Sequence, residues 1–333
     1  MRLPKLGGIL LRYNETKING SALPKRRSAQ PGSELLHGCV KHFELLLMVL
    51  PGLLLLLIFR YGPIYGLTIA FKDFNMSDGI WGSAWSGFEN FRRLFAGDEF
   101  LKTFKNTLVI SLLKLLFTLP APIVLALLLN ELKGTGFKRI VQSCTYIPYF
   151  FSWIVLSGII TSVFSTRGPV NLLFSLLGAS KPVEFFGNGA LFISMLIVTE
   201  VWKNYGWNSI LYIATMSGID ESLYEAARID GAGRWRQIIS ITIPCIIPTI
   251  VTVFILNLGG ILNAGFDQIY NLYNPTVYDV SDIIDTYVLR RMDVMDYSLG
   301  TAAGLFKSVI SLILVVLSNR FINLISGDEL GLW

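Results

Sequence analysis

The chain has few of the side chains on which most enzymes and metal sites depend. Its 333 residues include two histidines, His37 and His42, and three scattered cysteines, Cys39, Cys144 and Cys245. A histidine-based metal site or catalytic triad therefore has almost no material, and the cysteines indicate small buried apolar residues rather than a disulfide framework. Because no acid/base or thiol cluster is visible either, we expect no catalytic residues and no metal.

Charge is also scarce. Only 15% of the residues are charged and 53% are hydrophobic, whereas a globular domain carries about 25% charged residues. This composition argues against a cytosolic enzyme and against a nucleic-acid partner. The net charge of +5 is concentrated in residues 1–41, where eight Lys or Arg face two Glu. A basic tail on a neutral apolar body is typical of the cytoplasmic end of a protein embedded in membrane lipid.

Long apolar runs are what the chain has instead. A spanning helix needs about 20 mostly apolar residues. Six such runs occur, at about 45–59 with an extension to 71, 107–129, 140–164, 191–212, 241–266 and 299–319. The sequence therefore predicts an all-α membrane protein with six transmembrane helices. We expect a basic cytoplasmic tail at 1–42, a transmembrane domain at 43–325 and a short tail at 326–333, with the first run retained as an anchor.

Loop charge predicts the orientation. The loops after the second and fourth runs are basic, whereas the loop at about 267–298 carries six aspartates against two arginines. Because basic loops stay in the cytoplasm, we expect both termini and the loop between the fourth and fifth runs to be cytoplasmic.

That loop, at 218–245, carries the most local signal. Ser222 and Glu225 have the spacing of a capping box, and Gly231 follows the helix where a left-handed residue is expected. A second amphipathic segment begins near Trp235. These features predict a helix–turn–helix on the cytoplasmic membrane surface, with the alternating charges of a solvated docking face.

The same loop resembles a known family. Glu225-Ala226-Ala227, Gly231 and Ile241-Thr242-Ile243-Pro244 match the cytoplasmic signature of permease subunits of bacterial binding-protein-dependent ABC importers, except that Ile243 stands where the pattern has leucine. The string from Tyr224 to Ala232 and the string that begins at Phe71-Lys72-Asp73-Phe74 are similar to the carbohydrate branch, in particular to maltose- and alginate-importer-like permeases for oligosaccharides and polysaccharide fragments. The resemblance covers about residues 43–325.

The resemblance implies a type I importer permease fold in the bacterial cell membrane. Its first loop helix would be the coupling helix, which sits in a groove on an ATP-binding subunit; the implied coupling residues are Tyr224, Glu225, Ala226, Ala227, Asp230, Gly231 and Ala232. The chain has no phosphate-binding G-x-x-x-x-G-K-[ST] motif. ATP and Mg are therefore expected on two separate subunits, beside a second homologous permease and an extracytoplasmic solute-binding protein.

Polar residues inside the runs are candidates for the path of the solute. A charge at mid-bilayer costs about 2.5–3.5 kcal/mol, so such residues face protein or water. The fourth run places polar and aromatic side chains on one face, where Lys203 could pair with Glu200. Amides and an indole suit a sugar. The candidate pathway residues are Glu200, Asn204, Trp207, Asn208, Asn257 and Asn263. The alternative is interhelical hydrogen bonding that only holds the bundle together.

Two further lysines lie inside runs. Lys114 and Lys307 could each have a pathway or ion-coupling role. The alternative is that each side chain snorkels towards an interface or a partner subunit, and we favour snorkelling. An ion- or proton-coupled secondary transporter is the alternative function. It would require matching inverted halves and a buried carboxylate relay, but only Glu200 lies well inside a run.

Overall fold

The computed structural model describes residues 43–132 and 134–326. The predicted tail at 1–42, the predicted tail at 326–333 apart from Ser326, and Lys133 lie outside the described residues. The chain divides into two units, Met1–Pro63 and Ile64–Trp333.

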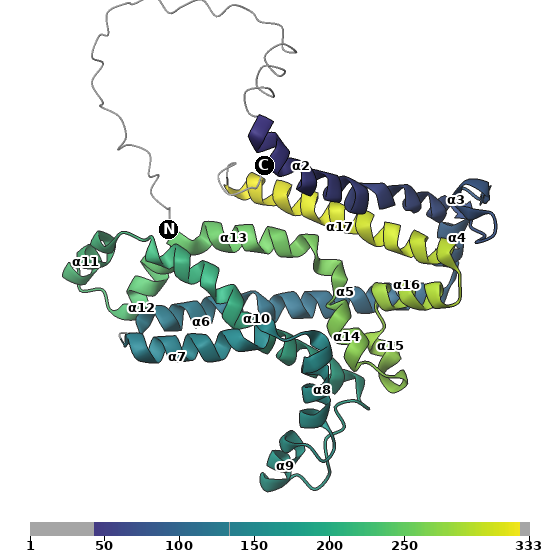
Figure 1. Cartoon of the computed structure of the whole chain (residues 1–333). Helices are drawn as coiled ribbons and strands as arrows, with labels where there is room; N and C mark the ends of the chain where they lie inside the picture. Colours follow the sequence, from purple (N-terminus) through teal and green to yellow (C-terminus); the bar gives the residue numbers. More distant parts are fainter. Residues whose placement is uncertain (1–42, 133, 327–333) are drawn as a thin grey trace, which may run out of the picture. The chain divides into compact units, whose positions relative to one another are not determined.

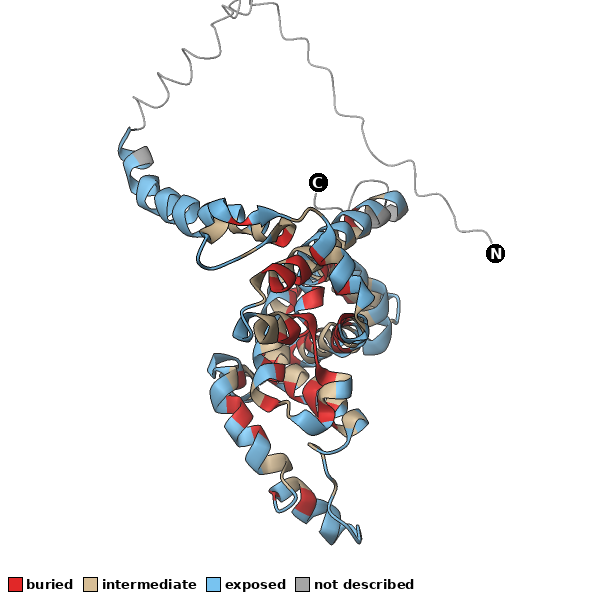
Figure 2. Cartoon of the chain, turned by 90° about the vertical axis from the view of Figure 1, so that its right-hand side faces the viewer, coloured by how far each residue is buried: buried red, intermediate tan, exposed pale blue. Residues whose placement is uncertain are grey.

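The described part of the first unit is helix α2 (Phe43–Leu56), followed by a π-helical turn (Leu57–Tyr61). The side chains that the structure describes there are exposed, as Figure 2 shows. Pro51 lies inside α2 without ending it.

The second unit is almost entirely helical (Figure 1). Its elements, in chain order, are a 3-10 helix (Gly62–Phe71, which begins at the end of the first unit), β1 (Lys72–Asp73), α3 (Gly79–Gly82), β2 (Ala84–Trp85), α4 (Glu89–Ala96), α5 (Asp98–Thr118), α6 (Pro120–Glu131), α7 (Thr135–Tyr146), a 3-10 turn η3 (Ile147–Phe150), α8 (Trp153–Phe164), α9 (Pro169–Leu176), α10 (Gly189–Ser217), α11 (Glu221–Ile229), α12 (Arg234–Gln237), a π-helical turn η4 (Ile238–Thr242), α13 (Ile243–Gly259), a 3-10 turn η5 (Ile261–Asn263), α14 (Phe266–Leu272), a 3-10 turn (Pro275–Val277), α15 (Tyr278–Ser281), α16 (Ile284–Asp293) and α17 (Tyr297–Ser326).

Within the described residues, four helical stretches are long and apolar enough to cross a membrane, and a fifth if α7 to α9, bent by 106°, form one broken span. The four are Phe43–Phe71, Asp98–Glu131, Arg234–Gly259 and Tyr297–Arg320. Helix α10 has 29 residues and is about 43 Å long at 1.5 Å per residue, but its polar residues lower its hydropathy. The number six therefore stays a prediction.

Two predicted spans are interrupted. The run at 140–164 is not one helix, because η3 with Pro148 separates α7 from α8, and proline both lacks an N–H and clashes with the preceding turn. The run at 241–266 ends early, at Gly259. The chain then turns through Ala264 and Gly265, which have φ values of 48° and 79°. Both interruptions expose backbone carbonyls that need hydrogen-bond donors.

The segment between the first two apolar runs forms short helices and a small hairpin. β1 and β2 pair antiparallel, with Lys72 opposite Trp85. Buried Asn90 of α4 fastens this hairpin by donating to the carbonyls of Ala70 (3.0 Å) and Lys72 (2.9 Å).

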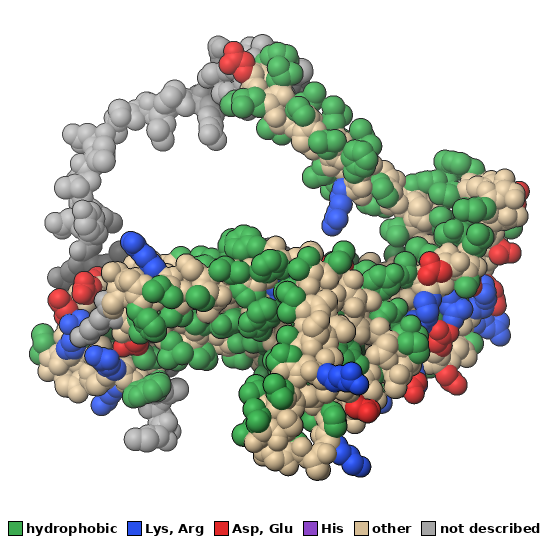
Figure 3. Space-filling view, turned by 60° about the horizontal axis from the view of Figure 1, so that its bottom comes forward, with side chains coloured by type: hydrophobic (Ala, Val, Ile, Leu, Met, Phe, Trp, Pro, Cys, Tyr) green, Lys and Arg blue, Asp and Glu red, His purple; other side chains and the backbone are tan. Residues whose placement is uncertain are grey.

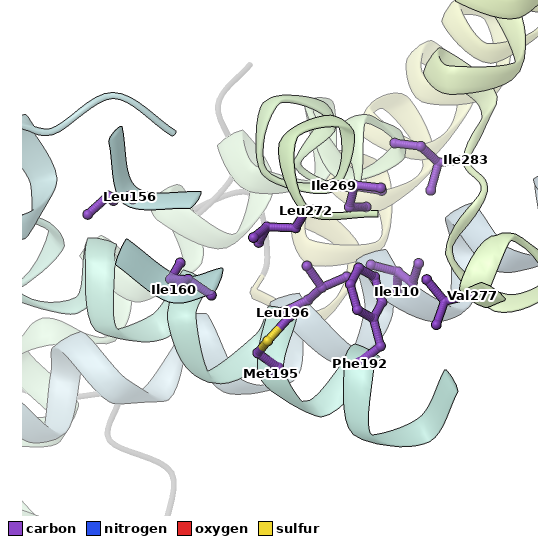
Figure 4. Packing of buried hydrophobic residues seen from close by; sticks show 11 residues of the cluster. Ile110, Leu156, Ile160, Phe192, Met195, Leu196, Ile269, Leu272, Val277 and Ile283 are labelled. Atoms are coloured by element: carbon purple, nitrogen blue, oxygen red, sulfur yellow. The ribbon is translucent and has the colours of Figure 1, made fainter. Parts of the chain in front are cut away.

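A buried apolar cluster fixes α10 against its neighbours. Figure 4 shows side chains from α5, α8, α10 and α14 converging, among them Ile110, Ile160, Leu196 and Ile269. Leu196 and Ile269 have no exposed surface. Because interiors of this kind are close-packed, the polar face of α10 next to the cluster is held in a defined place.

Candidate functional site

Helix α11 begins one residue after Asp220. The Asp220 carboxylate accepts a hydrogen bond from the backbone N–H of Ser222 at 2.9 Å, which holds the pKa of Asp220 below its ordinary value. The predicted capping box of Ser222 with Glu225 is therefore wrong. Aspartate takes the N-cap position because its carboxylate satisfies a free N–H of the first turn and is stabilised by the helix dipole.

The helix ends as the sequence predicted. Gly231 has φ +74°, the left-handed conformation that glycine adopts without steric cost. The Ala232 N–H reaches the Ala227 carbonyl at 2.8 Å, and the Gly231 N–H reaches the Arg228 carbonyl at 3.1 Å, which is a Schellman closure. Gln237 of α12 then donates to the Ala232 carbonyl at 2.8 Å. The turn between α11 and α12 is thus fixed by backbone and side-chain bonds.

The loop presents an apolar and charged surface. Ile229 is 87% exposed and Trp235 is 77% exposed, and Glu225, Ala226 and Asp230 are exposed as well. Figure 3 shows acidic and basic side chains over the end of the second unit that carries α11 and α12. Large apolar side chains that are exposed next to small ones mark a surface suited to a partner protein.

Among the implied coupling residues, Tyr224 faces the spanning helices. Its hydroxyl group lies 2.9 Å from the hydroxyl of Thr242, the last residue of η4, and Thr242 is only 2% exposed. The side chain of Tyr224 therefore links α11 to the residue that immediately precedes α13.

A buried ion pair lies on the polar face of α10. The Glu200 carboxylate accepts from Asn204 at 2.7 Å and from the Lys114 ammonium of α5 at 3.1 Å. Lys114 also donates to the Ala264 carbonyl at 2.8 Å and to Gln268. Since the Lys114 side chain is 8% exposed, the expectation that it snorkels towards an interface is wrong.

Lys203 does not pair with Glu200, as we had expected it could. Its ammonium donates instead to the carbonyls of Tyr149 (3.0 Å), Pro148 (3.4 Å) and Phe151, which belong to the interruption between α7 and α8. The ammonium group of Lys203 can be buried because these three carbonyls replace the water molecules that it loses.

Lys307 is also held by protein groups. It donates to both carboxylate oxygens of Asp285 in α16, at 2.7 and 2.6 Å, and to the side-chain oxygen of Asn263 in η5, at 2.7 Å. With 14% of its side chain exposed, Lys307 does not snorkel either. Asn263 is therefore a partner of Lys307, which favours the structural alternative for this candidate pathway residue.

The remaining candidates keep free polar groups. Trp207 lies flat against Tyr149, with ring centroids 4.7 Å apart and an interplanar angle of 6°. Asn208 and Asn257 are exposed and, within the described residues, make no side-chain hydrogen bond. The structure thus joins Glu200 to Asn204 and gives Trp207 an aromatic partner. Sequence reasoning missed Tyr149 and Gln268, because neither lies in a recognisable motif.

Comparison with known proteins gives consistent matches. The family model of the binding-protein-dependent transport system inner membrane component matches residues 95–327. Protein LplB of Bacillus subtilis (strain 168) is 43% identical over 279 residues, 83% of this chain and 87% of that protein. The polygalacturonan/rhamnogalacturonan transport system permease protein YteP of the same organism is 42% identical over 290 residues, 86% and 89% of the two chains.

Solved structures match as well. A bacterial alginate ABC transporter in complex with alginate pentasaccharide-bound periplasmic protein contains a chain that is 37% identical, with a TM-score of 0.82. The match covers 90% of this chain and 100% of that chain. A second structure, of a bacterial ABC transporter involved in the import of the acidic polysaccharide alginate, gives 38% identity and a TM-score of 0.80 over 86% and 98%. The predicted permease fold is confirmed.

Proposed function

The chain belongs to the family of binding-protein-dependent transport system inner membrane components, and from that premise we propose that it is the permease subunit through which an ATP-driven ABC importer passes a carbohydrate. It is a multi-pass membrane protein, and we propose that it has no catalytic activity of its own. The observation that carries the proposal is the likeness to the alginate importer over 90% of this chain.

The cargo we propose is an oligosaccharide or polysaccharide fragment. Its path would run along the face of α10 that carries Asn204, Trp207 and Asn208, with Asn257 of α13 contributing from the neighbouring helix. The stacked pair of Trp207 and Tyr149 offers an apolar plate for a sugar ring. The exposed amides offer both donors and acceptors for hydroxyl groups.

The energy for transport would come from ATP hydrolysis by separate subunits. We propose that α11 lies on the cytoplasmic side, as do both termini, and that Leu223, Glu225 and Ile229 dock on an ATP-binding subunit. The exposure of these three side chains supports that role, since a helix without a partner would leave them in water. The complete assembly would contain a second permease, two ATP-binding subunits and an extracytoplasmic solute-binding protein.

The secondary-transporter alternative gains no support. Glu200 is the acid that a proton relay would need, yet its two oxygens are already bonded to Lys114 and Asn204.

Uptake into liposomes tests the proposal. With the solute-binding protein and the ATP-binding subunits present, uptake should require ATP and persist when the proton gradient is collapsed. Trp207→Ala should raise the sugar concentration needed for half-maximal uptake. Trp202→Ala is the matched control, because Trp202 lies on α10 but lines an apolar groove of about 760 Å³ beside α5 and α6. ATP-independent uptake that an uncoupler abolishes would overturn the proposal.

A further inference from the structure

Helix α11 is attached to the spanning helices by very little. Within residues 43–132 and 134–326, the bond between Tyr224 and Thr242 is the one side-chain hydrogen bond that joins α11 to another helical element. Figure 1 shows α11 at the periphery of the second unit, beside α12. The chain itself leaves α11 through glycines, with Gly218 before the helix and Gly231 and Gly233 after it.

The covalent connection from α11 to α13 passes through the π-helical turn Ile238–Thr242. The turn directly after α11 is fixed by its hydrogen bonds, but a bend at the π-helical turn would absorb a movement of α11 before it reached α13. A second attachment at the end of that turn prevents this loss. We propose that the hydroxyl of Tyr224 is this second point, and that Tyr224 is a positioning residue which passes the movement of α11 to span five. The inference rests on the proposed coupling role of α11.

The place where Tyr224 is attached suits this task. Thr242 ends the π-helical turn Ile238–Thr242 and immediately precedes α13. A π-helical turn is wider than an α-helical turn and is less regularly bonded, so it is a natural place for a helix to change its direction. Pro244, in the first turn of α13, has no N–H to bond backwards.

The side of α11 that carries Tyr224 differs from the proposed docking side. Tyr224 contacts the buried residue Thr242 of η4, whereas Glu225 and Ile229 of α11 are exposed. The Schellman closure at Gly231 and the bond from Gln237 to Ala232 keep the following turn in one shape. Helix α11 can thus bind a partner with one face while it holds the start of α13 with the other.

Removal of either hydroxyl tests the link. Tyr224→Phe and Thr242→Val keep the ring and the branched shape but lose the bond. Each should lower the sugar imported per ATP hydrolysed by about two- to tenfold, the equilibrium equivalent of one net hydrogen bond. The double variant should lose no more than either single variant, since both remove the same bond. Thr242→Ser, which keeps the hydroxyl, should retain the parent ratio.

A second pair of hydroxyl groups provides a matched control. Thr215 of α10 and Thr249 of α13 form another hydroxyl pair, at 3.1 Å, that does not involve α11. Thr249→Val should leave the ratio of sugar to ATP unchanged. A merely structural role of Tyr224 would lower the amount of folded complex without altering this ratio, so purified complexes are compared at equal amounts.

Glu225→Lys separates the inference from the function on which it rests. If Glu225→Lys imports sugar at the full ATP-driven rate, the coupling role of α11 fails and this inference fails with it. If Glu225→Lys abolishes import but Tyr224→Phe keeps the parent ratio, only the role of the hydroxyl is refuted. Additive losses in the double variant would refute it too.

Discussion

Removal of the ammonium group of Lys114 should be strongly destabilising. The side chains of Lys114 and Glu200 are only 8% and 17% exposed, so water cannot replace either partner. Breaking a buried ion pair from one side costs about 3–5 kcal/mol, because the remaining charge is left without compensation. Lys114→Met should therefore lower the free energy of unfolding by about that amount.

The same substitution also removes hydrogen bonds from the interruption after α13. The Ala264 carbonyl and the side-chain oxygen of Gln268 both accept from Lys114. Gln268 is fully buried and donates in turn to the Leu196 carbonyl and to the Thr199 hydroxyl, each at 2.8 Å. Each buried acceptor that loses its donor adds about 1–3 kcal/mol. Part of this cost is shared with the ion pair, so the whole effect is expected near the upper end of the range.

A double substitution distinguishes charge from packing. Lys114→Met with Glu200→Gln removes both charges, so it should be more stable than Lys114→Met alone. Lys102→Met is the control, because Lys102 pairs with Asp279 where the two side chains are 53% and 84% exposed. That pair is worth about 0–1 kcal/mol. The measurement is equilibrium unfolding of the purified protein in mixed detergent micelles. If Lys114→Met and Lys102→Met unfold together, the reasoning from burial is refuted.

Three further predictions follow from single residues. Gly206→Ala should destabilise the protein by about 1–3 kcal/mol, because the new methyl group would lie 2.1 Å from a backbone carbonyl oxygen of α7. Gly158→Ala is the control and should be neutral or stabilising, because the space around Gly158 is open. Thermal unfolding compares the two variants. Lys203→Met should loosen η3 and speed hydrogen exchange at its amides, since three carbonyls lose their donor. Asp220→Ala should speed exchange at the Ser222 amide, whereas Asp220→Asn should not.

The cap at Asp220 also has a defined pH dependence. Because bonding to Ser222 lowers the pKa of Asp220, its stabilising effect is complete at neutral pH and above the pKa of the unfolded chain. It is lost only as the pH falls through the lowered pKa of the folded state. Faster exchange at Ser222 in mild alkali than at neutral pH, after correction for intrinsic rates, would contradict this sign.

The sequence predicted the parts of the fold that depend on near neighbours. The left-handed conformation at Gly231 follows from its position after a short amphipathic helix, and the helical character of the apolar runs follows from their length. The N-cap was misassigned because Asp220 and Ser222 both suit that position and lie two residues apart. The break at Pro148 could have been inferred from the proline itself, but the length of the apolar run outweighed it.

The roles of the three lysines inside the bundle depend on the folded chain. Lys203 donates to carbonyls of the interruption between α7 and α8, while Lys114 and Lys307 hold Ala264 and Asn263 in the interruption after α13. An interrupted helix in apolar surroundings exposes carbonyls that nothing in lipid can satisfy. An ammonium group has three N–H donors, so one lysine can satisfy up to three acceptors.

This pairing of lysines with helix interruptions explains why hydropathy misjudged them. Taken alone, Lys114 is an unfavourable charge within an apolar run, and snorkelling is the least costly solution for an isolated helix. Its partner at Ala264 is 150 residues away and becomes visible only after α13 has ended and the chain has turned back towards α5. The lysine and the interruption each carry a cost that the other reduces, and neither segment of sequence shows that alone.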